Sequence, residues 1–259
     1  MSARPVLTIL LPTFNEAQNI VELITAIRST LGGMGLSYEI RVIDDNSDDG
    51  TAEKVRQAFG NAVHVIVRTT ERGLASALLL GIEQASGEFL LLMDSDFNHK
   101  PSDIPRLLEQ INCADLIIGS RYIKGGGMPH ARIRHKLSLL FNLFIRAMLG
   151  LPVKDSLSGF VCVRRGLLMR LPLGNIFTGY GDFCIRLMYI AQKSGLRVKE
   201  VPVEYGNRLG GTSKTRFFYH GIQYAKVVFA MRQTEIEPLP KGVLAAAAAT
   251  AIKASAGAE

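Results

Sequence analysis

The chain has 259 residues, of which 47% are apolar and 20% are charged, a balance typical of a soluble globular protein with one full hydrophobic core. The formal net charge of +7 at pH 7 favours an anionic partner, such as an anionic membrane surface or a phosphorylated substrate. We expect no nucleic-acid binding, because the sequence has no Trp, no zinc-finger spacing and no basic-aromatic strand motif that would stack bases.

The cysteines and the apolar runs indicate a cytoplasmic protein. Cys113, Cys162 and Cys184 are odd in number and widely spaced, which fits reduced thiols better than a disulfide framework or a metal site. The first apolar run stops at Pro12 and is followed by no signal-peptide cleavage pattern. No stretch approaches the ~18 apolar residues of a membrane-spanning helix, so we expect a cytoplasmic chain unless something else anchors it.

Strand and helix signals alternate through the first half of the chain. Ile20, Leu23, Ile24, Ile27 and Leu31, for example, recur at the spacing of one helix face. The same kind of pattern predicts strands over residues 6–11, 39–44, 63–67, 88–93 and 114–119, and helices over 16–31, 48–59 (capped by Asp48 or Gly50), 73–85 and 103–110 (capped by Ser102). Strands that alternate with helices of this length predict a parallel sheet with right-handed crossovers.

The pattern changes after the three glycines at 125–127. It predicts helices over 134–149, 181–193 and 217–232 and strands over 158–163 and 196–203. Residues 234–259 are low in complexity and are predicted to be disordered or a frayed helix. We therefore expect one folded domain over residues 1–233, followed by a tail.

Polar side chains follow several of the predicted strands at the point where each strand ends. In an open parallel sheet, ligands bind beyond these carboxyl ends. Turn chemistry accounts for one loop rich in Asp, Asn and Ser, but two acidic loops and an Arg at the same edge indicate a site. The segments are 12–16 after the first strand, 44–48 after the second, 94–98 after the fourth and 119–122 after the fifth.

The two carboxylates after the fourth strand indicate a cation. Asp94 and Asp96 share a face if the strand continues through them, and two like charges held that close repel each other unless a cation, a proton or solvent intervenes. Carboxylates cannot bind a phosphate directly, but they hold Mg²⁺ or Mn²⁺ while substrate phosphates and waters complete the shell. The sequence therefore predicts a divalent-cation site for a phosphorylated ligand.

Six motifs in order resemble family 2 glycosyltransferases, and within them the polyprenol-phosphate sugar transferases such as the dolichyl-phosphate mannose synthases. They are PTFNE (12–16), VIDDNSDDGT (42–51), MDSDFNHKP (93–101), GSRY (119–122), DSLSGF (155–160) and NRLGGTSK (207–214). The resemblance covers roughly residues 6–232. It implies a GT-A fold, which is a Rossmann-like, mostly parallel sheet flanked by helices, with C-terminal helical additions and a catalytic domain over residues 1–233.

The resemblance also implies roles for individual residues. Pro12, Phe14, Glu16, Ile43 and Asp45 would surround the base and ribose of the donor nucleotide. Asp94 and Asp96 would be the carboxylates that hold Mg²⁺ or Mn²⁺ and the diphosphate, with Ser95 beside them. Asn98 would be the third metal ligand; it stands where the mannose synthases more often carry a Gln, whose side chain is longer.

Basic residues complete the implied set. Arg121, Arg208 and Lys214 would contact donor or acceptor phosphates and, with Asp94 and Asp96, would form the catalytic group. The residue types fit this role without the family, because an Arg fork binds phosphate oxygens bidentately and the neighbouring glycines allow close approach. The alternative for Arg208 and Lys214 is a solvated basic loop.

The implied reaction is inverting transfer of a sugar, mannose favoured, from a nucleotide-diphosphate donor, GDP-mannose favoured, to a polyprenyl monophosphate. Such a phosphate is already ionised near neutral pH and needs cations rather than a base; Arg134 is a further candidate. A hydroxyl acceptor, in contrast, needs a base, for which Asp182 is the candidate, although we favour Asp182 as a helix cap. Another donor sugar remains an alternative.

The helix predicted over 134–149 is apolar on one face and basic at its start. It is predicted either to lie on an anionic membrane surface, at the inner face of the membrane, or to be buried in the core or in a homodimer. A membrane-anchor partner is also compatible with the sequence. Of the nearby side chains, we expect Arg72 to approach the nucleotide and His99 to be solvated.

Other classes fit less well. A sugar-phosphate nucleotidylyltransferase usually carries a Gly- and Arg-rich loop after its first strand, and residues 10–19 contain no Gly. A processive polysaccharide synthase carries a Trp-bearing motif and spanning helices, which this sequence lacks. A catalytically silent nucleotide-sugar binding protein is a further alternative, against which the intact acidic pair and arginines argue.

Overall fold

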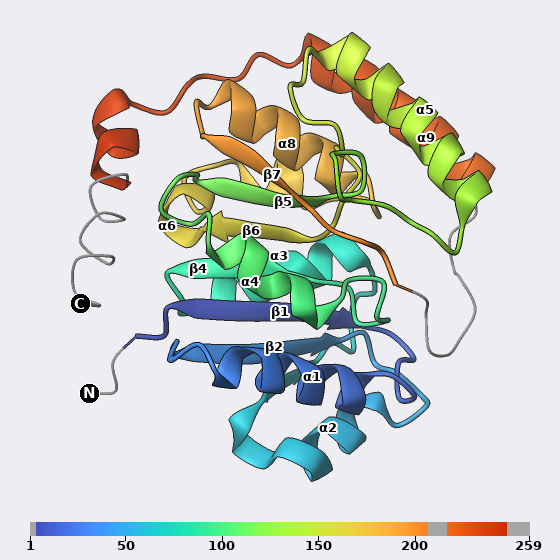
Figure 1. The fold of residues 1–259 in the computed structure, drawn as a ribbon, viewed down its shortest axis with the longest axis vertical. Coiled ribbons are helices and arrows are strands. Elements are labelled where there is room, and N and C mark those ends of the chain that lie inside the picture. The colour runs from blue at the N-terminus through green and yellow to red at the C-terminus, as the bar shows by residue number, and fades with distance from the viewer. Residues whose placement is uncertain (1–3, 207–216, 248–259) are drawn as a thin grey trace.

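The computed structural model describes residues 4–206 and 217–247, and for residues 217–220 it describes the backbone alone. A seven-stranded sheet runs through the centre in the order β3-β2-β1-β4-β6-β5-β7 (Figure 1). The strands are β1 (Leu7–Thr13), β2 (Tyr38–Asp44), β3 (His64–Val67), β4 (Phe89–Leu92), β5 (Leu116–Ser120), β6 (Val161–Arg164) and β7 (Val198–Pro202).

The sheet is mostly parallel, as the alternating pattern predicted, with one reversal. β6 pairs antiparallel with both β4 and β5, while the pairs β1–β2, β1–β4, β2–β3 and β5–β7 are parallel. The sequence pattern did not indicate this direction, because an apolar strand buried on both faces reads the same either way. The reversal brings the start of β6, rather than its end, to the carboxyl edge of its neighbours.

Helices cover both faces of the sheet (Figure 1). One face packs against α1 (Ile20–Gly32), α2 (Thr51–Phe59) and α4 (Ile104–Leu108). The other packs against α3 (Leu74–Gln84), α5 (Arg132–Leu149), α6 (Arg165–Leu168), α7 (Leu173–Ile176), α8 (Phe183–Lys193) and α9 (Phe217–Gln233). β1 shows why two layers form, because Leu7, Ile9 and Leu11 enter the first core and Leu10 enters the second.

The helix boundaries differ from the sequence pattern where side chains bond to the loops. α1 begins at Ile20, four residues after the predicted start, because the backbone of residues 15–17 donates hydrogen bonds to the next loop instead of to a helix. α2 follows Gly50, which takes a left-handed conformation, as one of the two predicted caps. Ser102 does not cap a helix. It lies inside a 3₁₀ turn (Pro101–Asp103) that precedes the short α4.

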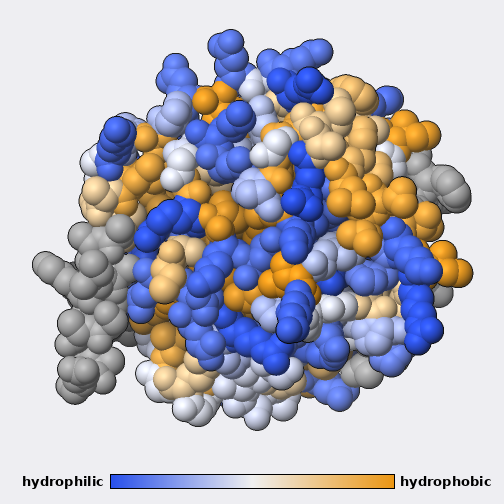
Figure 2. Space-filling view, turned by 45° about the horizontal axis from the view of Figure 1, so that its top comes forward, coloured by the Kyte–Doolittle hydropathy of each residue, from blue (hydrophilic) through white to orange (hydrophobic). Residues whose placement is uncertain are grey.

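α5 and α9 lie side by side at one end of the molecule (Figure 1). They pack through aromatic side chains: the rings of Phe141 and Tyr224 are 6.0 Å apart, and those of Phe144 and Phe229 are 6.2 Å apart. Figure 2 shows apolar side chains gathered on this side of the surface. Within the described ranges, no helix is both long enough and apolar enough to cross a membrane.

Part of the predicted tail packs on the domain. Residues 241–247 are helical, and Leu239 and Leu244 contact the core on the side of α8. The Leu239 N–H donates a 3.0 Å hydrogen bond to the Ser194 carbonyl, which ties this segment to the end of α8. Residues 248–259 lie outside the described part of the chain.

Candidate active site

A cavity of about 620 Å³ opens at the carboxyl edge of the sheet, where the sequence places its polar loops. Its walls come from the loops after β1, β2, β3, β4, β5 and β7, the segment before β6, the loop before α8, and helices α3, α5, α8 and α9. The predicted site residues that line it are Pro12, Phe14, Glu16, Asp45, Asp94, Ser95, Asp96, Asn98, Arg121 and Arg134.

Two loops on one side of the cavity are bonded to each other. The Asn15 N–H donates to Ser47 Oγ at 2.8 Å, and the Glu16 N–H donates to Thr51 Oγ1 at 2.9 Å. Asp44, which is buried, accepts hydrogen bonds from Thr13 Oγ1 at 3.0 Å and from Ser47 Oγ at 2.6 Å. These bonds hold the loops after β1 and β2 in one arrangement, so Asp44 has a structural role.

Asp45 reaches the cavity as a buried acceptor. Its Oδ2 accepts the Gly73 N–H at 2.7 Å, and its Oδ1 lies 3.2 Å from Arg68 Nε. Burial raises the pKa of Asp45 in spite of these partners, and the side chain is only 9% exposed. Gly73 and Arg68 therefore hold the Asp45 carboxyl in one orientation at the cavity wall, where it can bind a polar group of a ligand.

Phe14 and Arg72 form the outer part of this wall. The Arg72 guanidinium lies 4.8 Å from the centre of the Phe14 ring, and its Nη2 donates to the Asn46 carbonyl at 3.3 Å. Arg72 lines the cavity, as the sequence indicated. Ile43 does not, because its side chain is fully buried among Leu10 and the helix α3. Its predicted place beside the nucleotide stays a prediction, which the cavity lining does not support.

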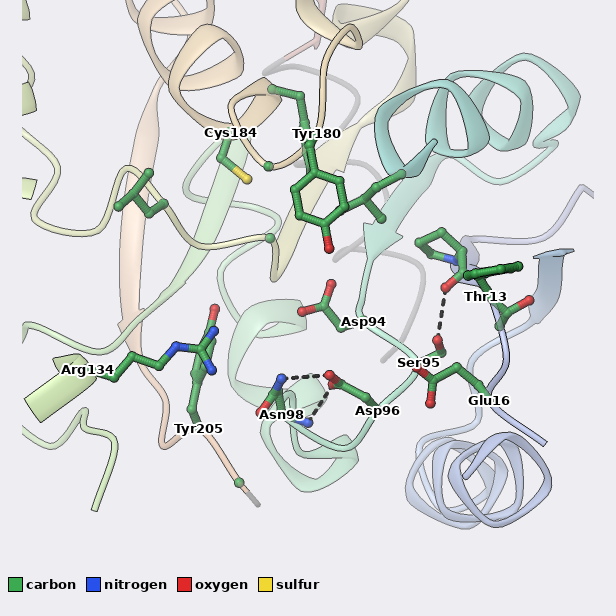
Figure 3. A pocket seen from close by; sticks show the side chains of 18 of the residues that line it. Thr13, Glu16, Asp94, Ser95, Asp96, Asn98, Arg134, Tyr180, Cys184 and Tyr205 are labelled. Atoms are coloured by element: carbon green, nitrogen blue, oxygen red, sulfur yellow. Dashed lines mark hydrogen bonds between the residues drawn. The ribbon is translucent and has the colours of Figure 1, made fainter. Parts of the chain in front are cut away.

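The acidic loop after β4 turns its carboxylates along the cavity wall (Figure 3). Asp94 is 39% exposed at its side chain, whereas Asp96 is 4% exposed. Asp96 accepts two hydrogen bonds from Asn98, at 3.0 Å from the backbone N–H and at 2.7 Å from Nδ2. Ser95 points the other way and donates to the Pro12 carbonyl at 2.9 Å. The loop thus presents one partly exposed carboxylate, Asp94, and one buried carboxylate, Asp96, to which Asn98 donates.

The donor set fits a divalent cation that is completed by a ligand. No group of three His, Cys, Asp or Glu side chains in the described residues is arranged to hold a metal ion. Mg²⁺ and Mn²⁺ are commonly held by one or two carboxylates together with substrate phosphates, and Asp94 and Asp96 can supply that number. The Asn98 amide group faces Asp96 as a donor, so its side chain supports this carboxylate first.

Arg121 follows β5 and is held by a buried partner. Its Nε and Nη2 donate to the two oxygens of Asp155 at 2.8 and 2.7 Å, and its backbone N–H donates to Asp155 at 2.9 Å. Arg121 is 6% exposed and Asp155 is fully buried. The usual bidentate edge of the guanidinium is therefore occupied, and a phosphate would approach its Nη1 edge from the cavity. Asp155 is the first residue of the DSLSGF motif, but the sequence did not indicate that it pairs with Arg121.

His99 is buried, in contrast to the solvated side chain that was expected. It is 1% exposed, and its ring stacks on Phe160 with the two centres 4.9 Å apart. Burial is the main cause that lowers the pKa of His99, which favours its neutral form. A single His in a polar loop carries no sequence signal of such burial, since the covering residues, Phe160 and Tyr205, come from the segments before β6 and after β7.

The opposite wall is built by the helical additions. Arg134, at the start of α5, points into the cavity beside Tyr205, and the Tyr180 hydroxyl is directed towards Asp94 (Figure 3). Tyr224 of α9 and Cys184 of α8 also line this side. Arg134 therefore faces the acidic pair across the cavity.

Asp182 stands at the N-cap position of α8, as expected, but its side chain does not cap the helix. The carboxylate accepts the Tyr180 N–H at 2.8 Å and pairs with Arg186. It lines a separate hollow against α9 rather than the cavity of Asp94. Arg208 and Lys214, the remaining predicted site residues, lie outside the described part of the chain.

Comparison with known proteins identifies relatives over most of the chain. Residues 8–171 match the family model described as glycosyl transferase family 2. A dolichol-phosphate mannosyltransferase of Pyrococcus furiosus is 37% identical over 81% of this chain, and the match spans 59% of that protein. An undecaprenyl-phosphate mannosyltransferase of Micrococcus luteus is 35% identical over 81% of this chain and 86% of that protein.

A solved structure confirms the predicted fold. Glucosyl-3-phosphoglycerate synthase of Mycobacterium tuberculosis, crystallised with Mn²⁺, UDP and glucosyl-3-phosphoglycerate, superposes with a TM-score of 0.67. The match covers 89% of this chain and 81% of that one at 21% sequence identity. At this identity the likeness concerns the fold alone.

Proposed function

The chain belongs to glycosyltransferase family 2, and on that premise we propose that it transfers a sugar from a nucleotide-diphosphate donor to a polyprenyl monophosphate. Mannose is the favoured sugar and GDP-mannose the favoured donor, because the polyprenol-phosphate relatives at 35–37% identity carry mannosyltransferase names. Another donor sugar of the same class is the alternative. We further propose that residues 1–233 form the catalytic unit.

One observation carries the proposal. The cavity has a pair of carboxylates, Asp94 and Asp96, on the wall formed by the sheet, and a cationic side chain, Arg134, on the wall formed by α5. The acidic wall suits a cation with its diphosphate, and the basic wall suits a second anion. A reaction between a nucleotide diphosphate sugar and a phosphate needs both walls at once.

Asp94 and Asp96 would hold Mg²⁺ or Mn²⁺, which when bound would act as a Lewis acid that stabilises charge on the leaving diphosphate. Asp45 would accept a hydroxyl of the nucleotide, since its carboxyl is held by Gly73 and Arg68 and is turned into the cavity. Phe14, braced by Arg72, would cover the base. The Nη1 edge of Arg121 would add positive charge at the diphosphate.

The acceptor side supports a phosphate rather than a hydroxyl. The carboxylates on the cavity wall, as far as the structure describes it, are Glu16, Asp45, Asp94 and Asp96, and all four come from the donor loops. A phosphate monoester acts as an ionised nucleophile and needs no base. Asp182, the candidate base of the hydroxyl-acceptor alternative, is paired with Arg186 in a different hollow. This placement argues against that alternative.

The test is the paired substitution Asp94→Ala with Asp96→Ala. We expect transfer from GDP-mannose to a short polyprenyl phosphate to fall by more than about 100-fold, because both proposed ligands of the cation are lost. Mn²⁺-dependent GDP binding, measured by calorimetry, should fall with it. Asp48→Ala is the matched control, since Asp48 is exposed at the same edge but does not line the cavity. Cation-dependent binding that survives the double substitution would refute the proposal.

We also propose that α5 and α9 rest on an anionic membrane surface at the inner face of the membrane, where a polyprenyl phosphate is available. The exposed apolar side chains on these helices include Ile133 at 78%, Leu140 at 67%, Ile222 at 63% and Phe229 at 52% exposure. Arg132, Arg134 and Lys136 add positive charge at the start of α5. An apolar face with a basic end is the combination that binds anionic lipid surfaces.

Liposome sedimentation tests the membrane proposal. We expect the protein to sediment with anionic liposomes at low salt and Ile133→Glu with Leu140→Glu to release most of it, because charge would replace the most exposed apolar groups of α5. Met34→Glu is the control, since Met34 is also exposed, at 40%, but lies after α1. Wild-type protein that stays in the supernatant would contradict the proposal. In that case a homodimer, or a stable complex with an anchor protein, would show what covers the apolar face of α5 and α9 instead.

A further inference from the structure

His99 follows the acidic residues after β4 and packs against the segments before β6 and after β7. Its ring is buried by Phe160, whose plane is 12° from that of the imidazole, and by the edge of Tyr205. Neither the proposed metal site nor the proposed nucleotide site uses this side chain directly. Its hydrogen bonds nevertheless involve Asp94, the more exposed of the two carboxylates.

The direction of each hydrogen bond around His99 follows from its partners. The Asp94 N–H donates to His99 Nδ1 at 2.9 Å, so this nitrogen carries no proton and the proton lies on Nε2. Nε2 lies 3.0 Å from the Tyr205 hydroxyl and 3.7 Å from Asp94 Oδ2, and the shorter contact is the hydrogen bond. The neutral imidazole therefore accepts from the acidic loop and donates to Tyr205.

The chain of hydrogen bonds continues to β5. Ser158 Oγ donates to the Gly119 carbonyl at 2.7 Å and lies 3.1 Å from the Tyr205 hydroxyl. Because the Ser158 proton is used on Gly119, Tyr205 donates to Ser158. The order is then Asp94 N–H, His99, Tyr205, Ser158 and the Gly119 carbonyl. Asp94 and Gly119 take part through their backbone groups, and the side chains of His99, Tyr205 and Ser158 are buried. We call this set the His99 relay.

The His99 relay joins the two charged sides of the site. At one end it fixes the backbone of Asp94, and at the other it reaches Gly119, two residues before Arg121. The Arg121 guanidinium also lies 4.5 Å from the centre of the Tyr205 ring. In the sheet, β4 and β5 are not neighbours, because β6 lies between them. The relay thus connects the loop that follows β4 with the end of β5 through polar groups.

We propose that His99 is a positioning residue, which holds the Asp94 backbone at a fixed place relative to Arg121 through Tyr205 and Ser158. This inference rests on the proposed function, in which Asp94 holds a cation and its diphosphate. A metal site requires its ligands to be placed within about 0.5 Å. A buried, directional chain of hydrogen bonds provides that precision, whereas a carboxylate on a free loop would not.

Substitutions at His99 separate its two hydrogen bonds. His99→Asn places an amide oxygen near the position of Nδ1 and keeps the acceptor for the Asp94 N–H. His99→Gln places an amide N–H near Nε2 and keeps the donor to Tyr205. His99→Phe removes both bonds and retains the stacking on Phe160, while Tyr205→Phe removes the next member of the relay. The probe is GDP titrated in the presence of Mn²⁺, with affinity and transfer kinetics measured separately.

We expect His99→Phe to weaken Mn²⁺-dependent GDP binding by about 10- to 100-fold, the range for residues that orient metal ligands. His99→Asn should restore most of the affinity and His99→Gln should not, because the bond to Asp94 is the direct anchor. Tyr205→Phe should weaken binding by several-fold, and its effect should be smaller in the His99→Phe background, since the relay is already broken. The control is Asp115→Asn, which breaks an ion pair at the opposite end of β5.

Each result decides the inference. Equal affinity of His99→Phe and the wild type, or equal losses for His99→Asn and His99→Gln, would overturn it. If His99→Phe fails to fold, Tyr205→Phe and His99→Asn supply the same comparison. The ¹⁵N shifts of the wild-type His99 ring, without any ligand, give an independent test, because a proton on Nδ1 would overturn the relay. A wild type that binds no Mn²⁺·GDP would instead refute the proposed function, and the ring shifts would then still decide the arrangement of the relay.

Discussion

Removal of Asp155 should be one of the most destabilising single substitutions near the cavity. Asp155→Ala takes away three hydrogen-bond acceptor contacts, at 2.7, 2.8 and 2.9 Å, and leaves the Arg121 guanidinium with 6% exposure. Breaking a buried ion pair by removing one partner costs about 3–5 kcal/mol, because the remaining charge is left without compensation. We expect a loss of that size in the free energy of unfolding.

The chain contains a matched pair for comparison. Arg197 contacts Asp115 with the same three donors, its backbone N–H at 2.9 Å, Nε at 3.0 Å and Nη2 at 2.8 Å, but the Arg197 side chain is 46% exposed. Water can replace the lost acceptor there, so Asp115→Ala should cost only about 1–2 kcal/mol. The same geometry in two environments isolates the contribution of burial.

Urea unfolding followed by circular dichroism measures both variants against the wild type. The combined substitution Arg121→Met with Asp155→Leu should recover most of the lost stability, since apolar side chains can replace a buried pair, but it should not recover transfer. Equal losses for Asp155→Ala and Asp115→Ala would refute the assigned role of burial. Recovery of transfer in the combined variant would refute the role of Arg121 in the site.

Three further predictions concern other parts of the fold. Burial alone would raise the pKa of Glu39, but hydrogen bonds, the largest of them from Arg41, lower it from 4.5 to about 2. The stabilisation by ionised Glu39 is therefore fully present above pH 4.5 and is lost as the pH falls towards 2. Glu39→Gln should reduce the pH dependence of the free energy of unfolding between pH 6 and 3. A pH dependence equal to that of the wild type would contradict this prediction. Asp182→Asn should retain donor binding and transfer within about threefold, because Asp182 lies outside the cavity, whereas a loss of transfer with intact binding would restore it as a base. Gly206→Ala should weaken Mn²⁺-dependent GDP binding by at least tenfold, because a Cβ would lie 2.6 Å from the Phe97 carbonyl and displace the acidic loop; wild-type affinity would show that the loop can move without consequence.

The local elements were largely predictable because their signals are local. The helix face of Ile20, Leu23 and Ile27 is buried as its spacing indicated, and the cavity lies at the strand ends that carry the polar loops. Asp94 and Asp96 line it together. Periodicity and turn chemistry act over a few residues, and the sequence contains them directly.

The long-range features were not predictable for the same reason. The Arg121–Asp155 pair joins residues 34 positions apart, and the contact of His99 with Tyr205 joins residues 106 positions apart. The direction of β6 depends on how the chain returns to the sheet, and the burial of Ile43 depends on the packing of α3. Such contacts form only when distant elements meet, so no single window of sequence contains them.

The reversed strand β6 also determines where the sheet must separate when the protein unfolds. The strands β3, β2, β1 and β4 lead to the loops of Phe14, Asp45 and Asp94, while β5 leads to Arg121 and β7 to Tyr205. Within the sheet these two groups of strands are hydrogen-bonded only through β6. Amide protons of Val161 and Val163 should therefore be among the slowest to exchange with solvent, because their release requires these two groups of strands to separate.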